Sequence, residues 1–162
     1  MHVSHYLARW RLRGYRAQLE LQSAAAEVEV TRELPCVITV KNAGRRTWQA
    51  SGAHPVRLSY HWRVGAQAIE GIRFSLPSDI RPGGHAVIEC AVPVPSAEGR
   101  YVLEFDLVCE LVGWFAQNGS PTLSIDLAAS STLSFGARFG LYSNDEISRV
   151  RMSLPVDEAA FL

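Results

Sequence analysis

Apolar and polar residues alternate with a period of two through most of the chain. The clearest case is VRLSYHWRV at residues 56–64, in which every second residue from Val56 to Val64 is apolar or aromatic. Successive side chains of a strand point to opposite sides, so this alternation is typical of a strand with one face toward a core. The other alternating segments are residues 15–22, 27–30, 35–42, 85–92, 100–110 and 122–128, and a short apolar segment, IRFSL, lies at residues 72–76.

Turn-forming residues separate these segments. Asn42-Ala43-Gly44 follows one of them, and PSDIRPGG and PVPSAEG contain the prolines and glycines of loops. No segment between Tyr15 and Ala128 shows a helical period long enough for a crossover helix between parallel strands. The sequence therefore predicts an all-β fold, an antiparallel β-sandwich of seven to nine strands.

The length of 162 residues suits a single domain. We expect the sandwich to span residues 15–128. Residues 1–14 place Tyr6, Leu7 and Trp10 at helix-like spacing among arginines, which predicts a short basic helix or arm, with a linker from a longer protein as the alternative. Residues 129–162 have no clear period, and we expect a C-terminal extension packed on the sandwich, with one more strand near residues 147–154.

Charge and hydropathy exclude several partners at this stage. The 16 basic and 16 acidic residues cancel, so no overall field favours nucleic acid or an anionic membrane. No apolar run is long enough to span a bilayer, and the first residues lack the apolar core of a signal peptide. We therefore expect a soluble, cytoplasmic protein without an integral membrane segment, for which oligomerisation stays possible.

Cys36, Trp62 and Cys109 lie on inward positions of three predicted strands. This arrangement resembles the Cys, Trp, Cys core of immunoglobulin domains, which implies an immunoglobulin-like sandwich. In secreted immunoglobulin domains the two cysteines are bonded, but here Cys90 also points inward and no CxxC pair or secretion signal is present. We expect three buried thiols, with a bridge between Cys36 and Cys109 as the alternative.

A second resemblance spans roughly residues 15–127. The segments NAGRRTW, PVRLSYHW, LPSDIRPGG, EGRYVLEFDLVCE and GWFAQNGS resemble immunoglobulin-like modules attached to bacterial polysaccharide-processing proteins. They are also similar in outline to the four-tryptophan domain of selective-autophagy receptors, and the architecture has a looser likeness to the O-antigen-binding sandwich of polysaccharide transporters. These resemblances imply an accessory or interaction module without chemistry of its own.

The residue types and spacings of known catalytic and metal sites are missing from the sequence. The five histidines show neither HxH nor HExxH spacing, and no nucleophile elbow, phosphate loop or dinucleotide fingerprint is present. Glu104, Asp106 and Glu110 share one outward strand face and could act as paired carboxylates on a glycoside, although such a face is ordinarily just solvated. We therefore expect no enzyme activity, no cofactor and no metal.

Polar residues on two predicted strands form the first part of a candidate binding surface. Arg57, His61 and Arg63 face outward on one strand, and Glu104 and Asp106 face outward on another. In an immunoglobulin-like order these strands share a sheet, so cross-strand ion pairs would form. Arginine and carboxylate groups in such pairs can also hydrogen-bond sugar hydroxyls.

Aromatic residues near GWFAQNG form the second part of that surface. We expect Asn118-Gly119 to make a tight reversal between the last two core strands. Trp114 and Phe115 then point to opposite faces, and we expect Trp114 to be exposed and to contact a glycan or partner together with Gln117. Phe115 is kept as a candidate contact, whereas Trp48, just after a turn, is expected in the core.

The sequence as a whole favours a noncatalytic carbohydrate-binding or accessory domain in bacterial surface-polysaccharide synthesis or export. Its expected partner is a glycan or a polysaccharide-processing protein. The alternative is a protein–protein interaction module, a subunit or domain adaptor, that binds no glycan.

Overall fold

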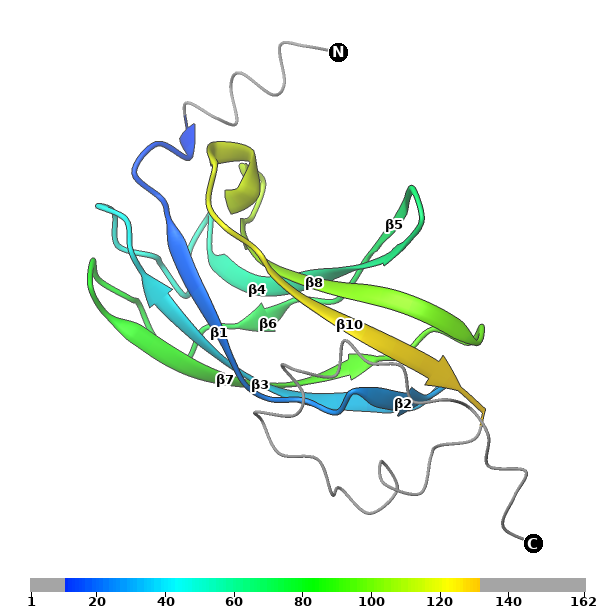
Figure 1. Cartoon of the computed structure of the whole chain (residues 1–162). Coiled ribbons are helices and arrows are strands. Elements are labelled where there is room, and N and C mark those ends of the chain that lie inside the picture. The colour runs from blue at the N-terminus through cyan, green and yellow to red at the C-terminus, as the bar shows by residue number, and fades with distance from the viewer. Residues whose placement is uncertain (1–10, 132–162) are drawn as a thin grey trace, which may run out of the picture.

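The computed structural model describes residues 11–131, which form two β-sheets facing each other across an apolar core (Figure 1). The smaller sheet has the order β1-β3-β7, with β1 at Ala17–Ser23, β3 at Glu33–Asn42 and β7 at His85–Pro93. The all-β, two-sheet class predicted from the alternation is confirmed. Residues 1–10 and 132–162 lie outside the described residues, and with them most of the predicted N-terminal arm and C-terminal extension.

The larger sheet has the order β2-β10-β8-β4-β5, with two short strands attached to it. The described residues thus hold ten strands, more than the seven to nine predicted, because the short strands β5 and β9 lie outside the alternating segments of the sequence. β10 ends at Ser130, two residues beyond the predicted end of the sandwich. The strands are β2 (Glu27–Glu29), β10 (Leu123–Ser130), β8 (Gly99–Cys109), β4 (Val56–Val64) and β5 (Gln67–Glu70), with β6 (Phe74–Ser75) on β4 and β9 (Gly113–Trp114) on β8.

One strand pair departs from the purely antiparallel prediction. β2 runs parallel to β10, with Glu27 opposite Ala128 and Glu29 opposite Ser130. The chain leaves the smaller sheet at the end of β1 and continues in the same direction along the edge of the larger sheet (Figure 1). A strand that changes sheets without reversing can pair in parallel without a crossover helix.

The predicted inward positions fill the core. Leu58, Leu103 and Phe105 are fully buried, and Trp48 lies in the core as expected. Val64 does not: it is 43% exposed, because the end of β4 and the β5 hairpin continue beyond the closely packed part of the sandwich. Within the part of the chain that the structure describes, no helix is long and apolar enough to cross a membrane.

The three cysteines are buried free thiols, and their neighbours differ from those of the immunoglobulin pair. Cys36 lies opposite Cys90 in the β3–β7 ladder, and the Cys90 thiol donates to the Cys36 carbonyl at 3.5 Å. Cys109 belongs to the other sheet and contacts the His54 carbonyl at 3.6 Å. The alternative Cys36–Cys109 bridge is therefore not the arrangement found. Hydrogen bonding with Cys90 and burial both raise the pKa of the Cys36 thiol, so it stays protonated at neutral pH.

The chain reverses after β8 at a different place from the one predicted. β8 turns at residues 110–112 into β9, and residues Phe115–Asn118 then form a 3₁₀ helix, η1, which ends at Gly119 with a φ of 79°. Asn118-Gly119 is thus a helix end and not a tight hairpin. The reason is Phe115, which is fully buried and packs edge-on against Trp48 and Tyr15, with ring centroids 5.4 and 5.3 Å apart. The helical turn brings Phe115 into the end of the core.

Trp62 tests the register of β4. Its ring is 4% exposed, packs edge-on against Tyr101 at 5.6 Å, and its Nε1 donates to the Pro93 carbonyl of the opposite sheet at 3.0 Å. We expect Trp62→Ala to lower the free energy of unfolding by about 3 to 5 kcal/mol, because it leaves a large cavity and an unpaired carbonyl. Urea melts of both proteins measure this difference. An unchanged midpoint would contradict the inward position of Trp62.

Candidate functional site

The outward face of β4 and β8 gathers the polar residues singled out in the sequence. The two strands pair antiparallel, with His61 opposite Glu104 and Ser59 opposite Asp106. Arg63 donates to Glu104 through Nε and Nη2, at 3.0 and 2.7 Å. The predicted sharing of one sheet, with ion pairs across the strands, is confirmed.

Arg73, which the sequence analysis missed, is the centre of this face. It lies between β5 and β6 and uses every nitrogen of its guanidinium group. Nε donates to Glu110 at 3.0 Å, Nη1 to the Ser59 hydroxyl at 3.0 Å, and Nη2 to Glu70. Arg57 completes the cluster at 3.8 Å from the same Glu110 oxygen. The only sequence signal for Arg73 was one charge inside the apolar segment IRFSL.

Trp114 lies on this face in contact with two of these residues. Its ring centroid is 4.4 Å from that of His61, and the Arg73 guanidinium carbon lies 4.9 Å from the Trp114 ring centroid. Cation–π attraction and ring stacking therefore fix the indole. Trp114 is partly exposed, as predicted, but two neighbours hold it, so it is not a free surface side chain.

His61 is the least satisfied polar group of the face. Its Nδ1 is buried, and no hydrogen-bond partner lies within reach among the described residues. Burial, as the largest cause, lowers the pKa of His61 below its ordinary value. The ring is therefore neutral at physiological pH, with hydrogen-bonding capacity beside Trp114.

Asp106 was predicted to face outward into solvent, and this is wrong. η1 folds back over β8 at Asp106, which is only 2% exposed. Its two carboxyl oxygens accept the backbone N–H groups of Leu107 at 2.7 Å and Ala116 at 3.1 Å. Burial raises the pKa of Asp106 to about 7 in spite of these bonds. Asp106 anchors η1 and is not a surface contact.

Phe115 is the second correction among the candidate contacts, because its ring is fully buried in the end of the core. Gln117 is exposed on η1, and its Oε1 accepts the backbone N–H of Trp114 at 3.1 Å. The structure therefore brings together five of the eight predicted residues on one face, with Gln117 at its margin. The five are Arg57, His61, Arg63, Glu104 and Trp114.

The charges of this face largely neutralise one another. Each of the three arginines, Arg57, Arg63 and Arg73, has a glutamate partner. Residues 11–131 contain no cluster of three or more His, Cys, Asp or Glu side chains suited to a metal ion. What the face offers is a partly exposed indole, a neutral imidazole and fixed polar groups, which suit hydrogen bonding and stacking.

Comparison with known proteins gives likenesses in structure only. No protein-family model and no curated protein matches the chain. Among solved structures, the CARDB domain of a Pyrococcus furiosus protein is 14% identical, with a TM-score of 0.47 and coverage of 74% of this chain and 99% of that one. A β-glucosidase from Listeria innocua in complex with glucose is 8% identical, with a TM-score of 0.49 and coverage of 74% and 17%.

A third similar structure is the alkylpurine DNA glycosylase of Pseudomonas fluorescens bound to DNA with an abasic site analog. It is 11% identical, with a TM-score of 0.42 and coverage of 72% of this chain and 30% of the glycosylase. The chain thus spans less than a third of either enzyme. At these identities and TM-scores the matches carry no information on function. None of the three names a polysaccharide-synthesis protein or a four-tryptophan domain, so that resemblance stays a prediction.

Asp106 predicts a defined pH dependence of stability. Because its pKa is raised in the folded state, the unfolded chain loses this proton first as the pH rises. The stability contributed by Asp106 therefore falls between about pH 4, the ordinary pKa, and about pH 7. We expect the free energy of unfolding to drop by about 2 kcal/mol more between pH 5 and pH 8 in the unmodified protein than in Asp106→Asn.

Urea melts at both pH values measure this difference. The Asp106→Asn variant has an amide in place of the titrating carboxyl, while His61 titrates in both proteins and cancels in the comparison. Parallel pH profiles of the two proteins would show that Asp106 is ionised throughout.

Proposed function

We propose that this domain is an immunoglobulin-like, noncatalytic module that binds carbohydrate. The strand order supports the fold assignment, since the pairs β3–β7 and β10-β8-β4 correspond to the B–E and G-F-C pairings of immunoglobulin domains. The setting, bacterial surface-polysaccharide synthesis or export, is proposed from the sequence resemblance of segments such as NAGRRTW and PVRLSYHW. The binding proposal depends chiefly on one observation, the partly exposed Trp114 between His61 and Arg73.

This arrangement holds the Trp114 indole in place before a ligand binds. Arg73 is bonded to β4, β5 and the turn after β8, and it packs against Trp114, so the indole does not have to be immobilised when a ligand arrives. Preordered contact groups reduce the entropy lost on binding. An indole beside polar groups suits a pyranose, which has an apolar face and a rim of hydroxyls. Gln117 is exposed beside the indole, and its amide N–H groups can donate to such hydroxyls.

Substitution of Trp114 tests the glycan proposal. On a glycan array the full chain should bind a subset of glycans, and Trp114→Ala should lose that signal. Loss of the His61 and Arg73 contacts should cost about 1 kcal/mol, so the variant should still fold. Gln117→Ala should weaken binding and, because it also removes the bond to the Trp114 N–H, should lower stability by about 0.5 to 1 kcal/mol.

Val87→Ala is the matched control, because Val87 is 55% exposed on the smaller sheet, away from the face. Its array profile should equal that of the unmodified protein. If Trp114→Ala folds and keeps the full profile, the glycan site is not at this face. A chain that binds no glycan contradicts the carbohydrate proposal.

A protein-interaction role is the second candidate, and exposed apolar residues around β5 favour it. Ile69 is 56% exposed and Ile72 is 49% exposed, and Val64 lies at the start of the same hairpin. β5 is the edge strand of the larger sheet, so its outer backbone groups can pair with another strand. A second copy of this chain, paired edge to edge through β5, would bury these side chains.

Ile69→Glu tests this alternative. Sedimentation equilibrium should show a concentration-dependent dimer for the unmodified chain and a monomer for Ile69→Glu. The variant dimer would bury one carboxylate from each copy in an apolar contact, which is unfavourable. Leu111→Glu, which changes an 85% exposed residue in the turn after β8, is the control and should leave the dimer intact. A monomeric unmodified chain at about 100 µM, where weak interfaces are populated, rules out the dimer.

A further inference from the structure

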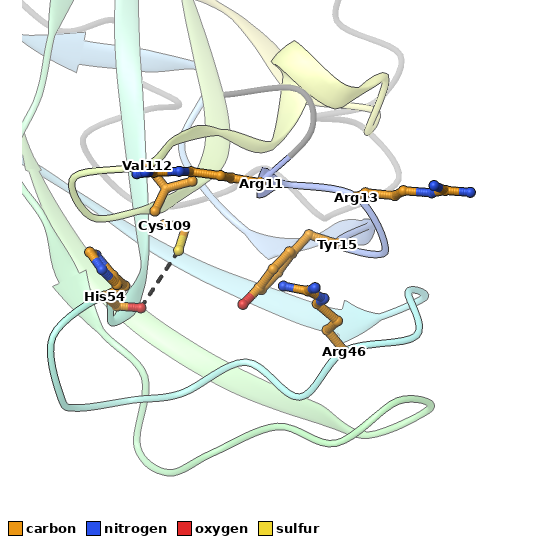
Figure 2. A pocket seen from close by; sticks show the side chains of 7 residues that line it. All are labelled: Arg11, Arg13, Tyr15, Arg46, His54, Cys109 and Val112. Carbon is orange, nitrogen blue, oxygen red and sulfur yellow. Dashed lines mark hydrogen bonds between the residues drawn. The ribbon is translucent and has the colours of Figure 1, made fainter. Parts of the chain in front are cut away.

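Two adjoining hollows lie at the end of the sandwich where β1 begins, and Figure 2 shows the residues that line the first of them. The first has a volume of about 520 Å³ and the second of about 650 Å³. Arg13, Tyr15 and Arg46 line both of them. The first hollow also contacts Arg11 and His54, with Cys109 and Val112 at its base, and the second also contacts Arg16 and Arg45.

Positive charge is concentrated in these hollows. Among the described residues, five arginines line them and no aspartate or glutamate does. Elsewhere in residues 11–131, Arg32, Arg57, Arg63 and Arg73 each pair with a glutamate, and Arg81 and Arg100 do not. No ion pair joins any of the five to a carboxylate of the described chain. Like charges held close together repel one another, and a bound anion relieves this repulsion.

Backbone bonds fix the two arginine-bearing segments against each other. The Gly14 carbonyl accepts the N–H groups of both Arg45 and Arg46, at 2.7 and 3.3 Å. The buried Asn42 amide donates to the Arg46 carbonyl at 2.8 Å. Gly44 allows the close approach, because a Cβ there would lie 2.3 Å from the Gly14 oxygen. The backbone positions of Arg45 and Arg46 next to Gly14 are thus set by the fold before any ligand binds.

Tyr15 separates the hollows and supplies a flat surface. Its ring packs against buried Phe115 at 5.3 Å, and the Arg46 guanidinium carbon lies 5.8 Å from the Tyr15 ring centroid. Arg46 and Tyr15 point toward each other in Figure 2. Because Tyr15 is wedged against the core, a ring carried by a ligand could stack there without displacing it.

We propose that these hollows bind a ligand that carries two linked phosphate groups. Guanidinium groups bind phosphate oxygens in a bidentate way, and the volumes fall in the range of small-molecule sites. A single carboxylate would balance one of five positive charges, whereas each phosphate monoester contributes about −1.5 to −2. A soluble nucleoside diphosphate and a membrane-anchored diphosphate headgroup share this chemistry. The site does not include Trp114, His61 or Arg73 and does not depend on the carbohydrate proposal.

Titration calorimetry of the full chain with pyrophosphate, at constant ionic strength, tests the site. The expected result is saturable binding of one pyrophosphate per chain. Arg46→Glu and Arg13→Glu should each weaken it by about tenfold or more, since each removes a charge-assisted contact and adds a repulsive one. Both positions are exposed, and the reversal relieves repulsion between arginines, so the melting temperature should not fall.

Arg100→Glu is the matched control. It makes the same charge change at the start of β8, nine residues or about 30 Å along the strand from Cys109. Pyrophosphate affinity of this variant should stay within about twofold of that of the unmodified chain, as expected for a change beyond the Debye length. Trp114→Ala should also bind pyrophosphate normally, so failure of the glycan proposal and failure of this one give different results.

Two further measurements distinguish the sources of the phosphate. Tighter binding of ADP than of pyrophosphate indicates a soluble nucleotide whose ring adds contacts. Co-sedimentation with vesicles that contain diacylglycerol pyrophosphate, lost in Arg46→Glu, indicates a lipid headgroup. No binding of pyrophosphate, or equal binding by Arg46→Glu, overturns the proposal. The proposal is also overturned if a single-stranded oligonucleotide binds more tightly than both pyrophosphate and ADP, and if Arg46→Glu and Arg13→Glu abolish the binding of the oligonucleotide.

Discussion

The end of the sandwich depends on one buried side chain, Asn42. Its Nδ2 donates to the carbonyls of Ile80 and Arg46, both at 2.8 Å, and its Oδ1 accepts the Gly44 N–H at 3.0 Å. Its own backbone N–H and carbonyl bond to Gly84 and Gly83 in the loop before β7. The fully buried Asn42 side chain therefore has partners for its oxygen and its nitrogen, and a buried amide left unpaired would cost about 1 to 3 kcal/mol.

The packing of the aromatic end follows from this network. Ile80, held by Asn42, bonds Trp48 through two backbone hydrogen bonds of 2.9 Å, and Trp48 packs against Phe115. Once Phe115 is buried, its neighbour Trp114 must point to the other side, onto the outward face of β4 and β8. The core end and the candidate carbohydrate face are thus two sides of one short segment.

The same network sets the position of the arginine-rich hollows, because Asn42 also holds the loop that carries Arg45 and Arg46. The net charge of zero gives no sign that paired and unpaired arginines lie on different surfaces of the domain. Glutamates neutralise the arginines on the sheet face, whereas the described residues that line the hollows at the end of the sandwich include five arginines and no carboxylate. Overall charge therefore describes poorly what each surface of this domain can bind.

The sequence by itself determined the strands, their inward faces and the class of fold, because the side-chain period of two is a local property that each strand displays alone. It also indicated that Arg57, His61 and Glu104 would share a face. Only the tertiary structure decided that Asp106 is covered by η1, that Phe115 fills the core end, and that Arg73 links four segments of the chain. It also brought Arg13 and Arg46 into one hollow. These outcomes depend on contacts between residues far apart in the chain, for which no local pattern exists.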